Sequence, residues 1–190
     1  MIFCICFYVG YAAPCRYDQY DRPILGYINM CPFILSTESD EAIESTISHE
    51  IAHALGFTSS TWANMRESDG ITPRTPRNEN GDVDESMMTC SNGESTLMKV
   101  PSNETTLWSG VLRNVPNSHA LKTPAVLAAA RKQAGCPTLM GAQLDNTPAH
   151  CMGSHLEERV YQGDLMTSIV DAKENRVSLV TLAVFEDMGW

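Results

Sequence analysis

Apolar residues recur every four positions in the most regular stretch of the chain, at Ile43, Ile47, Ile51 and Leu55. This spacing is typical of one face of an α-helix that packs on a core. Residues 36–40 ahead of it are rich in cap-forming and acidic side chains, and Gly56 follows it. The pattern therefore predicts a helix over 41–55 whose apolar stripe is buried.

Two apolar runs near the N-terminus have the length of β-strands. Residues 24–30 follow a turn-like Asp-Arg-Pro segment, and residues 2–9 are rich in β-favouring side chains. The first run predicts one strand. The second predicts either another strand or the core of a signal peptide that ends at Ala12 and Ala13, with the strand favoured because no basic residue precedes Arg16.

The second half of the chain contains two further helical patterns. Thr123 as a cap, Pro124 in the first turn and Gly135 after the end delimit an alanine-rich helix. The other pattern runs over 178–188, stops at a glycine and is apolar on almost every side. That composition predicts a buried helix.

Residues 61–118 have a different texture, dominated by Pro, Asn, Gly, Ser and Thr. We interpret them as a surface insertion that contributes to specificity or flexibility rather than to the hydrophobic core. Trp62 and Trp108 would anchor it to the rest of the chain. A length of 190 residues suits one domain over 1–190. The predicted fold class is α+β, with a mixed sheet edge packed on the helix over 41–55 and a mainly helical C-terminal half.

Charge and hydrophobicity argue against a nucleic-acid partner and against a transmembrane segment. Thirteen basic against 23 acidic residues give a formal charge of −10, which repels phosphate backbones, so no nucleic-acid partner is expected. The run over 2–9 is too short to cross a bilayer as a helix, and the sequence has no other transmembrane candidate.

The cysteine content favours an oxidising compartment. Seven scattered cysteines are many for a reduced protein and are not spaced as a zinc-finger ladder. The glycosylation acceptor at Asn103 agrees weakly with secretion. We predict a disulfide between Cys15 and Cys31, which would close a hairpin-sized loop.

The most informative string, His-Glu-Ile-Ala-His over 49–53, lies inside the best predicted helix. Residues four apart lie on one helix face, so His49 and His53 can reach a single tetrahedral zinc ion. Glu50 then lies beside the metal, where it can take a proton from a zinc-activated water and pass it to a leaving amine. This pattern indicates peptide hydrolysis.

A catalytic zinc site usually needs a third protein ligand. Gly56 can end the helix and turn the chain back towards the metal. The residues leave the third ligand open among His119, His150, His155 and a carboxylate. Of the histidines, His155 alone is followed, eleven residues on, by a methionine in a turn-like setting, Met166. That methionine could form an apolar floor under the metal.

These motifs together resemble the leishmanolysin family of zinc endopeptidases. The resemblance rests on residues 49–57, 153–159 and 164–166 in that order, separated by a long insertion. It extends to 11–15, 21–29, 130–136 and 185–190 and so covers most of the chain. This family is the metzincin branch in which an insertion separates the glycine from the third histidine. At the position where other metzincins carry that histidine, this chain has Ser59.

The resemblance implies a role for each residue of the site. His49, His53 and His155 would bind one Zn²⁺ per chain, Glu50 would be the general base and acid, and Met166 the Met-turn residue. Gly56 would be the helix-ending glycine. Relatives also carry a pro-segment, more sheet before the active-site helix and a cysteine-rich C-terminal domain, so the chain corresponds to part of a catalytic domain.

Two functions are compatible with the sequence. The first is a zinc-dependent metalloendopeptidase acting on protein or peptide substrates, located outside the cell or at its surface, although some relatives act in the cytoplasm. The alternative is a non-catalytic adhesion or binding module that keeps the peptidase fold and associates with surfaces. The complete set of His49, Glu50 and His53 favours the peptidase.

Overall fold

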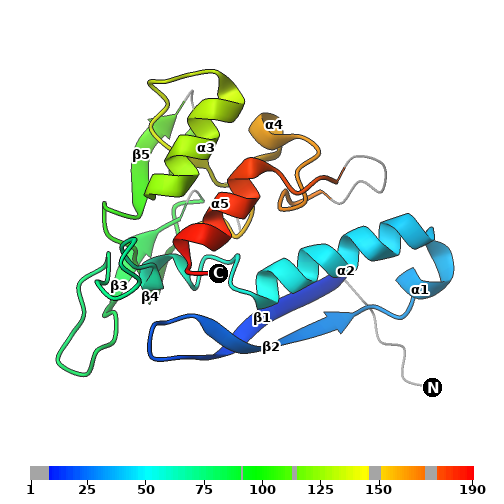
Figure 1. Cartoon of the computed structure of the whole chain (residues 1–190), viewed down its shortest axis with the longest axis horizontal. Coiled ribbons are helices and arrows are strands. Elements are labelled where there is room, and N and C mark those ends of the chain that lie inside the picture. The colour runs from blue at the N-terminus through cyan, green and yellow to red at the C-terminus, as the bar shows by residue number, and fades with distance from the viewer. Residues whose placement is uncertain (1–8, 91, 113–114, 146–150, 170–174) are drawn as a thin grey trace.

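The computed structural model describes residues 9–90, 92–112, 115–145, 151–169 and 175–190, and the side chains of 108–117 are outside the description. Its N-terminal part is an antiparallel hairpin of β1 (Gly10–Tyr17) and β2 (Pro23–Met30), with the long helix α2 (Asp40–Ala54) lying along it (Figure 1). A short helix, α1 (Ile34–Thr37), connects the two. The hairpin and α2 thus form two packed layers, one of strands and one of helix.

Helix α2 has the limits that the sequence predicts. The Ser39 side chain accepts a hydrogen bond from the Ala42 N–H, and two acidic residues occupy the first turn. Gly56 follows the helix at a φ of +112°, a conformation that costs little for glycine. The helix packs tightly on the hairpin, because a Cβ on Gly26 would lie 3.0 Å from the Ala54 Cβ.

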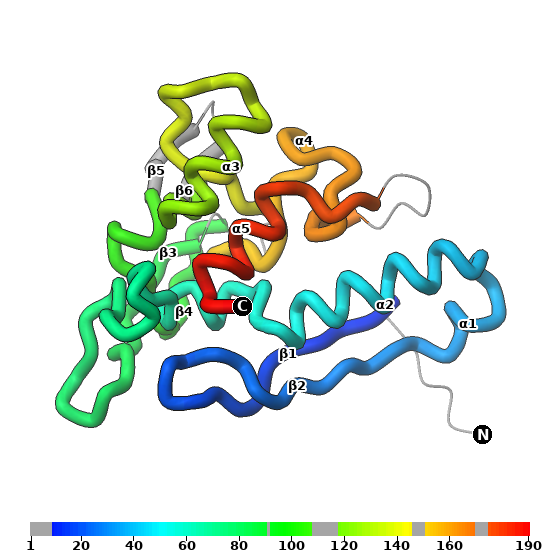
Figure 2. The backbone as a smooth tube through the Cα atoms, viewed as in Figure 1, coloured from blue at the N-terminus to red at the C-terminus, as the bar shows by residue number. Residues whose placement is uncertain are grey.

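The remaining elements form the second part of the chain (Figure 2). They are η1 (Trp62–Asn64), β3 (Glu85–Thr89), β4 (Ser95–Lys99), β5 (Thr106–Leu112), β6 (Val115–Leu121), α3 (Pro124–Ala134), β7 (Ala142–Gln143), α4 (Glu158–Tyr161) and α5 (Leu179–Asp187). Strands β3 and β4 pair as a hairpin, and β5, β6 and β7 form a three-stranded sheet. The predicted strand over 24–30 and both C-terminal helices are confirmed, each within one residue.

The α+β class is confirmed, but the described part of the sheet beside α2 is antiparallel and not mixed. Every pairing between the described strands is antiparallel. Parallel pairing occurs in this part of the chain as two isolated bridges, Leu156 with Thr167 and Asp164 with Arg176. A two-stranded hairpin joined by a short turn can form no parallel pair, because parallel strands need a longer crossover.

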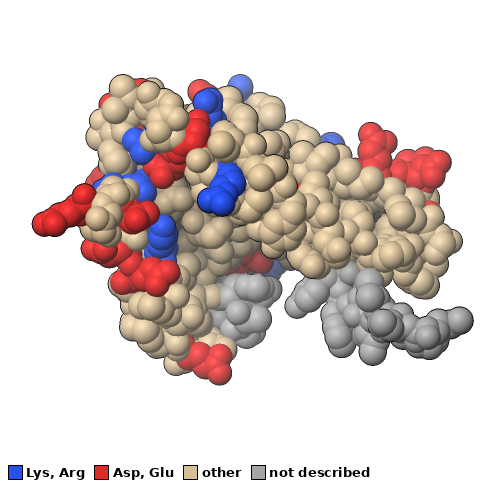
Figure 3. Space-filling view, turned by 90° about the horizontal axis from the view of Figure 1, so that it is seen from below, with Lys and Arg blue, Asp and Glu red and all other residues tan. Residues whose placement is uncertain are grey.

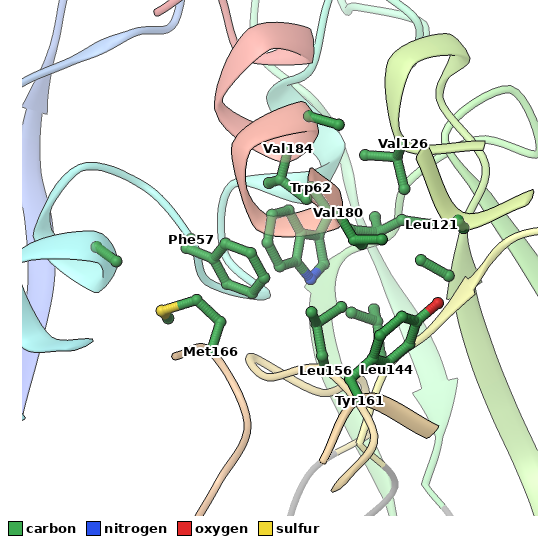
Figure 4. Close-up of a cluster of buried hydrophobic side chains, with 14 of the residues drawn as sticks. Phe57, Trp62, Leu121, Val126, Leu144, Leu156, Tyr161, Met166, Val180 and Val184 are labelled. Carbon is green, nitrogen blue, oxygen red and sulfur yellow. The ribbon is translucent and has the colours of Figure 1, made fainter. Parts of the chain in front are cut away.

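The hydrophobic core lies between α3, α5 and the sheet of β6 and β7. Helices α3 and α5 pack on each other, and Phe57 and Trp62 enter from the segment after α2 (Figure 4). The largest fully buried apolar side chains are Trp62, Phe57, Leu121, Leu144, Leu156, Met166, Val126, Val180 and Val184. Residues 144–145 and 151–166 are thereby anchored in this core through Leu144, Leu156 and Met166.

Residues 61–118 are more ordered than their turn-rich composition indicates. They contain the β3–β4 hairpin, β5 and the start of β6. Trp62 is fully buried, as predicted, and donates its indole N–H to the Gly153 carbonyl at 3.0 Å. The side chain of Trp108 lies outside the described part. Two hairpins thus supply regular backbone hydrogen bonds to a segment that contributes to the core.

The predicted burial of the α2 stripe is wrong. Ile47, Ile51 and Leu55 keep 37%, 43% and 38% of their surface exposed. The buried residues of α2 are Thr46, His49, Glu50, Ala52 and His53. On α5, Leu179 and Leu182 are also about half exposed, so that helix is not buried on every side. Periodicity identifies the helix, but which face is covered depends on what packs against it.

The predicted disulfide between Cys15 and Cys31 is also wrong. Cys15 is an exposed free thiol near the turn end of the hairpin, where it contacts the Leu25 carbonyl. Cys31 lies at the opposite end, with its N–H bonded to the Val9 carbonyl, and forms a different disulfide. Cys90 and Cys151 form a second disulfide, which ties β3 to the segment ahead of His155.

The strand predicted over 2–9 lies almost wholly outside the described residues. Strand β1 begins just after it, at Gly10. Among the described helices, none is both long and apolar enough to cross a membrane.

Candidate metal centre and active site

Three histidines from two distant segments converge on one point. His49 and His53 lie one turn apart on α2, and His155 arrives from the segment between β7 and α4. The Nε2 atom of His53 lies 3.0 Å from that of His49 and 3.1 Å from that of His155. One nitrogen of each ring lies within 4.8 Å of the others, which is a spacing that a single metal ion can bridge.

The opposite nitrogen of each helix histidine fixes the tautomer of its ring. The Nδ1 atom of His49 lies 2.6 Å from the Leu165 carbonyl, and that of His53 lies 2.5 Å from the Phe57 carbonyl. Because a carbonyl oxygen can only accept, both Nδ1 atoms carry the hydrogen. The converging Nε2 atoms are then bare lone pairs, which repel one another unless a cation lies between them.

Burial keeps the two helix histidines neutral. His49 and His53 are 5% and 7% exposed. Burial, with a smaller contribution from the neighbouring histidines, lowers the pKa of His49 to about 4 and that of His53 to about 3. Neutral imidazole is the form that binds a metal, so the site is ready to bind one at neutral pH.

Glu50 is buried beside the three rings. Its Oε2 atom has no hydrogen-bond partner among the described residues. Burial raises the pKa of this carboxyl, while the nearby His155 acts in the opposite direction. The first residue of β1, Gly10, lies against it, since a Cβ there would come 2.9 Å from Glu50 Oε1. A buried carboxylate with a free oxygen is available for proton transfer.

Met166 lies in a tight turn under the site. The Asp164 carboxylate accepts hydrogen bonds from the Met166 N–H at 2.7 Å and from the Thr181 hydroxyl at 2.7 Å, which ties the turn to α5. The Met166 side chain is fully buried next to Phe57 (Figure 4). The preceding residue, Leu165, provides the carbonyl that orients His49. The turn thus supports the site through its backbone, at the Leu165 carbonyl.

The loop after α2 holds the segment that carries His155. The Ser154 hydroxyl accepts a hydrogen bond from the Ser59 N–H at 3.1 Å and contacts the Thr58 and Ser59 hydroxyls. Ser59 therefore contacts the neighbour of His155. Gly56 starts this loop by reversing the chain after α2.

Sequence reasoning leaves one histidine unplaced and misses one carboxylate. His119, a candidate for the third ligand, lies outside the cluster of three histidines and is 3% exposed within β6, because it faces the same side of the strand as the buried Leu121. His150 lies outside the described residues. Asp145, which contacts the His155 ring, is not expected from the sequence, since one acidic residue ten positions before a histidine forms no recognisable pattern.

Comparisons with known proteins agree on one family. A family model described as leishmanolysin, a peptidase family, matches residues 6–190. The chain is 36% identical to a leishmanolysin-like peptidase of Caenorhabditis elegans and 35% identical to one of Drosophila melanogaster. It is 32% identical to the ciliated left-right organizer metallopeptidase of Mus musculus.

The alignments cover almost all of this chain but a small part of each relative. Each covers 96% of the chain and 28%, 27% and 23%, respectively, of the three relatives. The chain thus spans about a quarter of the length of these proteins. The family match over 6–190, together with these identities, shows that the chain belongs to the leishmanolysin peptidase family.

Proposed function

We propose that this chain carries the active site of a zinc-dependent metalloendopeptidase, in which His49, His53 and His155 bind one Zn²⁺ ion. The observation that carries the proposal is the convergence of three Nε2 atoms beside the buried carboxylate of Glu50. Membership of a peptidase family supports the same assignment. Met166 is proposed as the Met-turn residue below the ion.

The donor set fits zinc. Three neutral imidazoles are a ligand set that catalytic zinc sites use, with a fourth position left for water or substrate. A bound Zn²⁺ would supply a Lewis acid that polarises the scissile carbonyl and lowers the pKa of a water ligand to about 7. The hydrogen bonds at Nδ1 of each histidine hold the rings in the orientation that this binding requires.

Glu50 is assigned as the general base and then the general acid. Its carboxylate would accept a proton from the attacking water and deliver it to the nitrogen of the leaving amine. The pKa of Glu50 is raised by burial, which makes the carboxylate a stronger proton acceptor. The unpaired Oε2 leaves a lone pair for this transfer.

The proposed substrates are proteins or peptides. The net charge of −10 disfavours a nucleic-acid partner. We also propose an extracellular or cell-surface location, since Cys90 and Cys151 form a disulfide and such bonds persist in oxidising compartments.

The test compares cleavage of a quenched broad-specificity peptide by the zinc-loaded chain with cleavage by its Glu50→Gln variant. Removal of the base should lower kcat by roughly 100- to 10,000-fold while zinc stays bound. Glu44→Gln is the matched control, because Glu44 is exposed on the same helix and should leave kcat unchanged. Chelation of zinc should abolish cleavage by the unaltered chain.

One result would contradict the proposal. If protein that is folded by circular dichroism and carries one zinc per chain cleaves nothing, the chain is not a complete peptidase site. Such a result would favour the alternative of a binding module that keeps the peptidase fold. Equal cleavage by the Glu50→Gln variant would contradict the role of Glu50 alone.

A further inference from the structure

His155 is the least enclosed of the three converging histidines. Its side chain is 24% exposed, whereas His49 and His53 are almost fully buried. It is also separated from His53 by 102 positions in the chain, so helix geometry cannot place it. Its orientation therefore depends on contacts made by its own segment.

The backbone places His155 directly opposite Asp145. The Asp145 N–H donates to the His155 carbonyl at 2.8 Å, and the Glu157 N–H donates to the Gln143 carbonyl at 3.0 Å. Leu144 and Leu156 form an antiparallel bridge between these two bonds. This short ladder fixes the register, and the side chains of Asp145 and His155 lie on the same face.

The Asp145 carboxylate contacts His155 twice. Its Oδ2 atom lies 3.3 Å from the His155 Nδ1 atom, and its Oδ1 atom accepts from the His155 N–H at 3.3 Å. Asp145 is 6% exposed, and within the described residues its ion-pair partner is His155 alone. A carboxylate held in this way accepts the Nδ1 hydrogen and leaves Nε2 free to face His53.

Gly153 provides the room for this arrangement. A Cβ at Gly153 would overlap the Asp145 carboxylate and the Asp145 carbonyl oxygen. The close approach is held by the indole of Trp62, which donates to the Gly153 carbonyl. Residues 153–155 therefore pack directly against the Asp145 carboxylate.

We propose that Asp145 is a positioning residue that fixes the tautomer and orientation of His155 for metal binding. This inference rests on the proposed zinc site. The other two rings are oriented by neutral backbone carbonyls, whereas His155 alone faces a carboxylate. A charged acceptor increases the basicity of the opposite nitrogen, and so strengthens the ligand that has the least enclosure.

The first experiment measures zinc affinity by competition with a chromophoric chelator, without any substrate. Asp145→Asn should weaken zinc binding by roughly 10- to 100-fold, the usual effect of removing such a partner. Asp187→Asn is the matched control. Its carboxylate accepts hydrogen bonds from the N–H groups of Ala125 and Val126 at the start of α3, so the variant should lose stability but keep its zinc affinity.

The second experiment reads the tautomer directly. In the zinc-free protein, ¹⁵N NMR of the His155 ring, assigned with a His155→Gln variant, should show the hydrogen on Nδ1. In Asp145→Asn the Nε2–H tautomer should gain population. A structural role of Asp145 would alter stability without changing this tautomer ratio.

Two results would overturn the inference: an Nε2–H tautomer in the unaltered protein, or zinc affinity within twofold of wild type for Asp145→Asn. Either is separable from failure of the proposed function. If zinc binds with the predicted dependence on Asp145 but no peptide is cleaved, the positioning role stands and the peptidase assignment fails. If the unaltered chain binds no zinc, both fail.

Discussion

Gly10 in β1 lies against Glu50. Because Gly10 has no side chain, the Glu50 carboxylate can occupy the space beside it. A Cβ there would approach Glu50 Oε1 to 2.9 Å and Met30 Sδ to 3.1 Å. Both atoms are at the ends of flexible side chains, so Gly10→Ala should displace them rather than unfold the protein. We expect kcat for peptide cleavage to fall by roughly 10- to 100-fold with little change in thermal stability.

Tyr11→Phe is the control for this change, because Tyr11 is the next residue of β1 and is 53% exposed on the opposite face. It should keep the kcat of the unaltered chain. Full activity in Gly10→Ala would show that the space beside Glu50 is not required for its function. A loss of zinc together with kcat would instead place the effect on the metal ligands.

His119 makes the stability of the chain depend on acidity. Burial lowers its pKa from 6.5 to about 4, and neither ring nitrogen has a hydrogen-bond partner in the described part of the chain. As the pH falls below about 6.5 the unfolded chain binds this proton first, so the free energy of unfolding decreases down to about pH 4. The expected loss attributable to His119 is about 2 kcal/mol at pH 5.

Urea denaturation of the unaltered chain and of His119→Leu, at pH 7.5 and pH 5, isolates this contribution. Other titrating groups, including His49 and His53, affect both proteins equally and cancel in the difference. The described residues that line the cavity beside His119 are uncharged, and Ser86, Met88 and Thr106 are among them. If the difference between the two proteins is the same at both pH values, His119 is not a buried neutral group.

The contrast between Asp145 and the histidines of α2 shows which site residues can be predicted from the sequence alone. His49 and His53 are predictable because helix geometry alone places residues four apart together. His155 requires the added information of Met166 and the family resemblance. Asp145 acts through a ladder contact that depends on how segments 143–145 and 155–157 pair, and no local pattern encodes that pairing.

At the scale of elements, the glycines that follow α2 and α3 differ in how strictly their positions require glycine. Gly56 has a φ of +112°, and a Cβ there would overlap the Met188 side chain and approach Pro23 Cγ to 3.0 Å. Gly135 has a φ of +60°, and a Cβ there would meet no described atom within 4 Å. Gly56→Ala should therefore lower the free energy of unfolding by about 3 kcal/mol, and Gly135→Ala by about 1 kcal/mol.

Equilibrium unfolding in urea measures the loss of unfolding free energy in each variant. The prediction is tested by the ratio of the loss in Gly56→Ala to the loss in Gly135→Ala. Gly56 also starts the loop whose Ser59 contacts Ser154, so Gly56→Ala should weaken zinc binding as well. Gly135 is remote from that loop, and its variant should keep full zinc affinity. Equal destabilisation by the two variants would mean that backbone strain at Gly56 is relieved by movement of α2.

Helix limits are more predictable than helix surroundings. Ser39, Gly56 and Gly135 act within a few residues of themselves, so the ends of α2 and α3 follow from local chemistry. The cap of α3 is an instructive exception. Thr123 is the cap that the sequence predicts, but the carboxylate of Asp187 in α5 accepts from the first N–H groups. That contact depends on the packing of α3 on α5.

At the scale of the whole molecule, the core and the histidine cluster are on one side of α2 and an apolar surface is on the other. The groove between β2 and α2, about 590 Å³, is lined by Ile24, Ile28, Ile51, Leu55 and Trp190, among others. Figure 3 shows a stretch of surface with few charged side chains between the acidic and basic groups on the left and the acidic groups at the right edge. Within the described residues β2 pairs with β1 alone, so one strand edge has free backbone groups.

This surface predicts that the isolated chain self-associates. Ile24 and Leu25 are 65% and 58% exposed, and Ile51 is 43% exposed on the facing helix, so contact between copies would remove a continuous apolar area from water. Placing a charge in the groove should oppose this association. Ile51→Lys should raise the dissociation constant at least tenfold, because burial of one isoleucine is worth about 1.5–3 kcal/mol. Since Ile51 is partly exposed, the unfolding free energy should change little.

Sedimentation velocity over a range of concentrations measures the association directly. Ile71→Lys is the matched control, since Ile71 is 64% exposed but does not line the groove between β2 and α2. An unaltered chain that stays monomeric at high concentration would contradict the prediction, as would equal effects of the two variants. If instead Ile51→Lys strongly destabilises the fold, the stripe of α2 is more deeply packed than its exposure indicates. A selective effect at Ile51 would show that the apolar stripe of α2 forms contacts between copies of the chain. The helical periodicity of the sequence would then reflect an intermolecular contact rather than burial in the core of one copy.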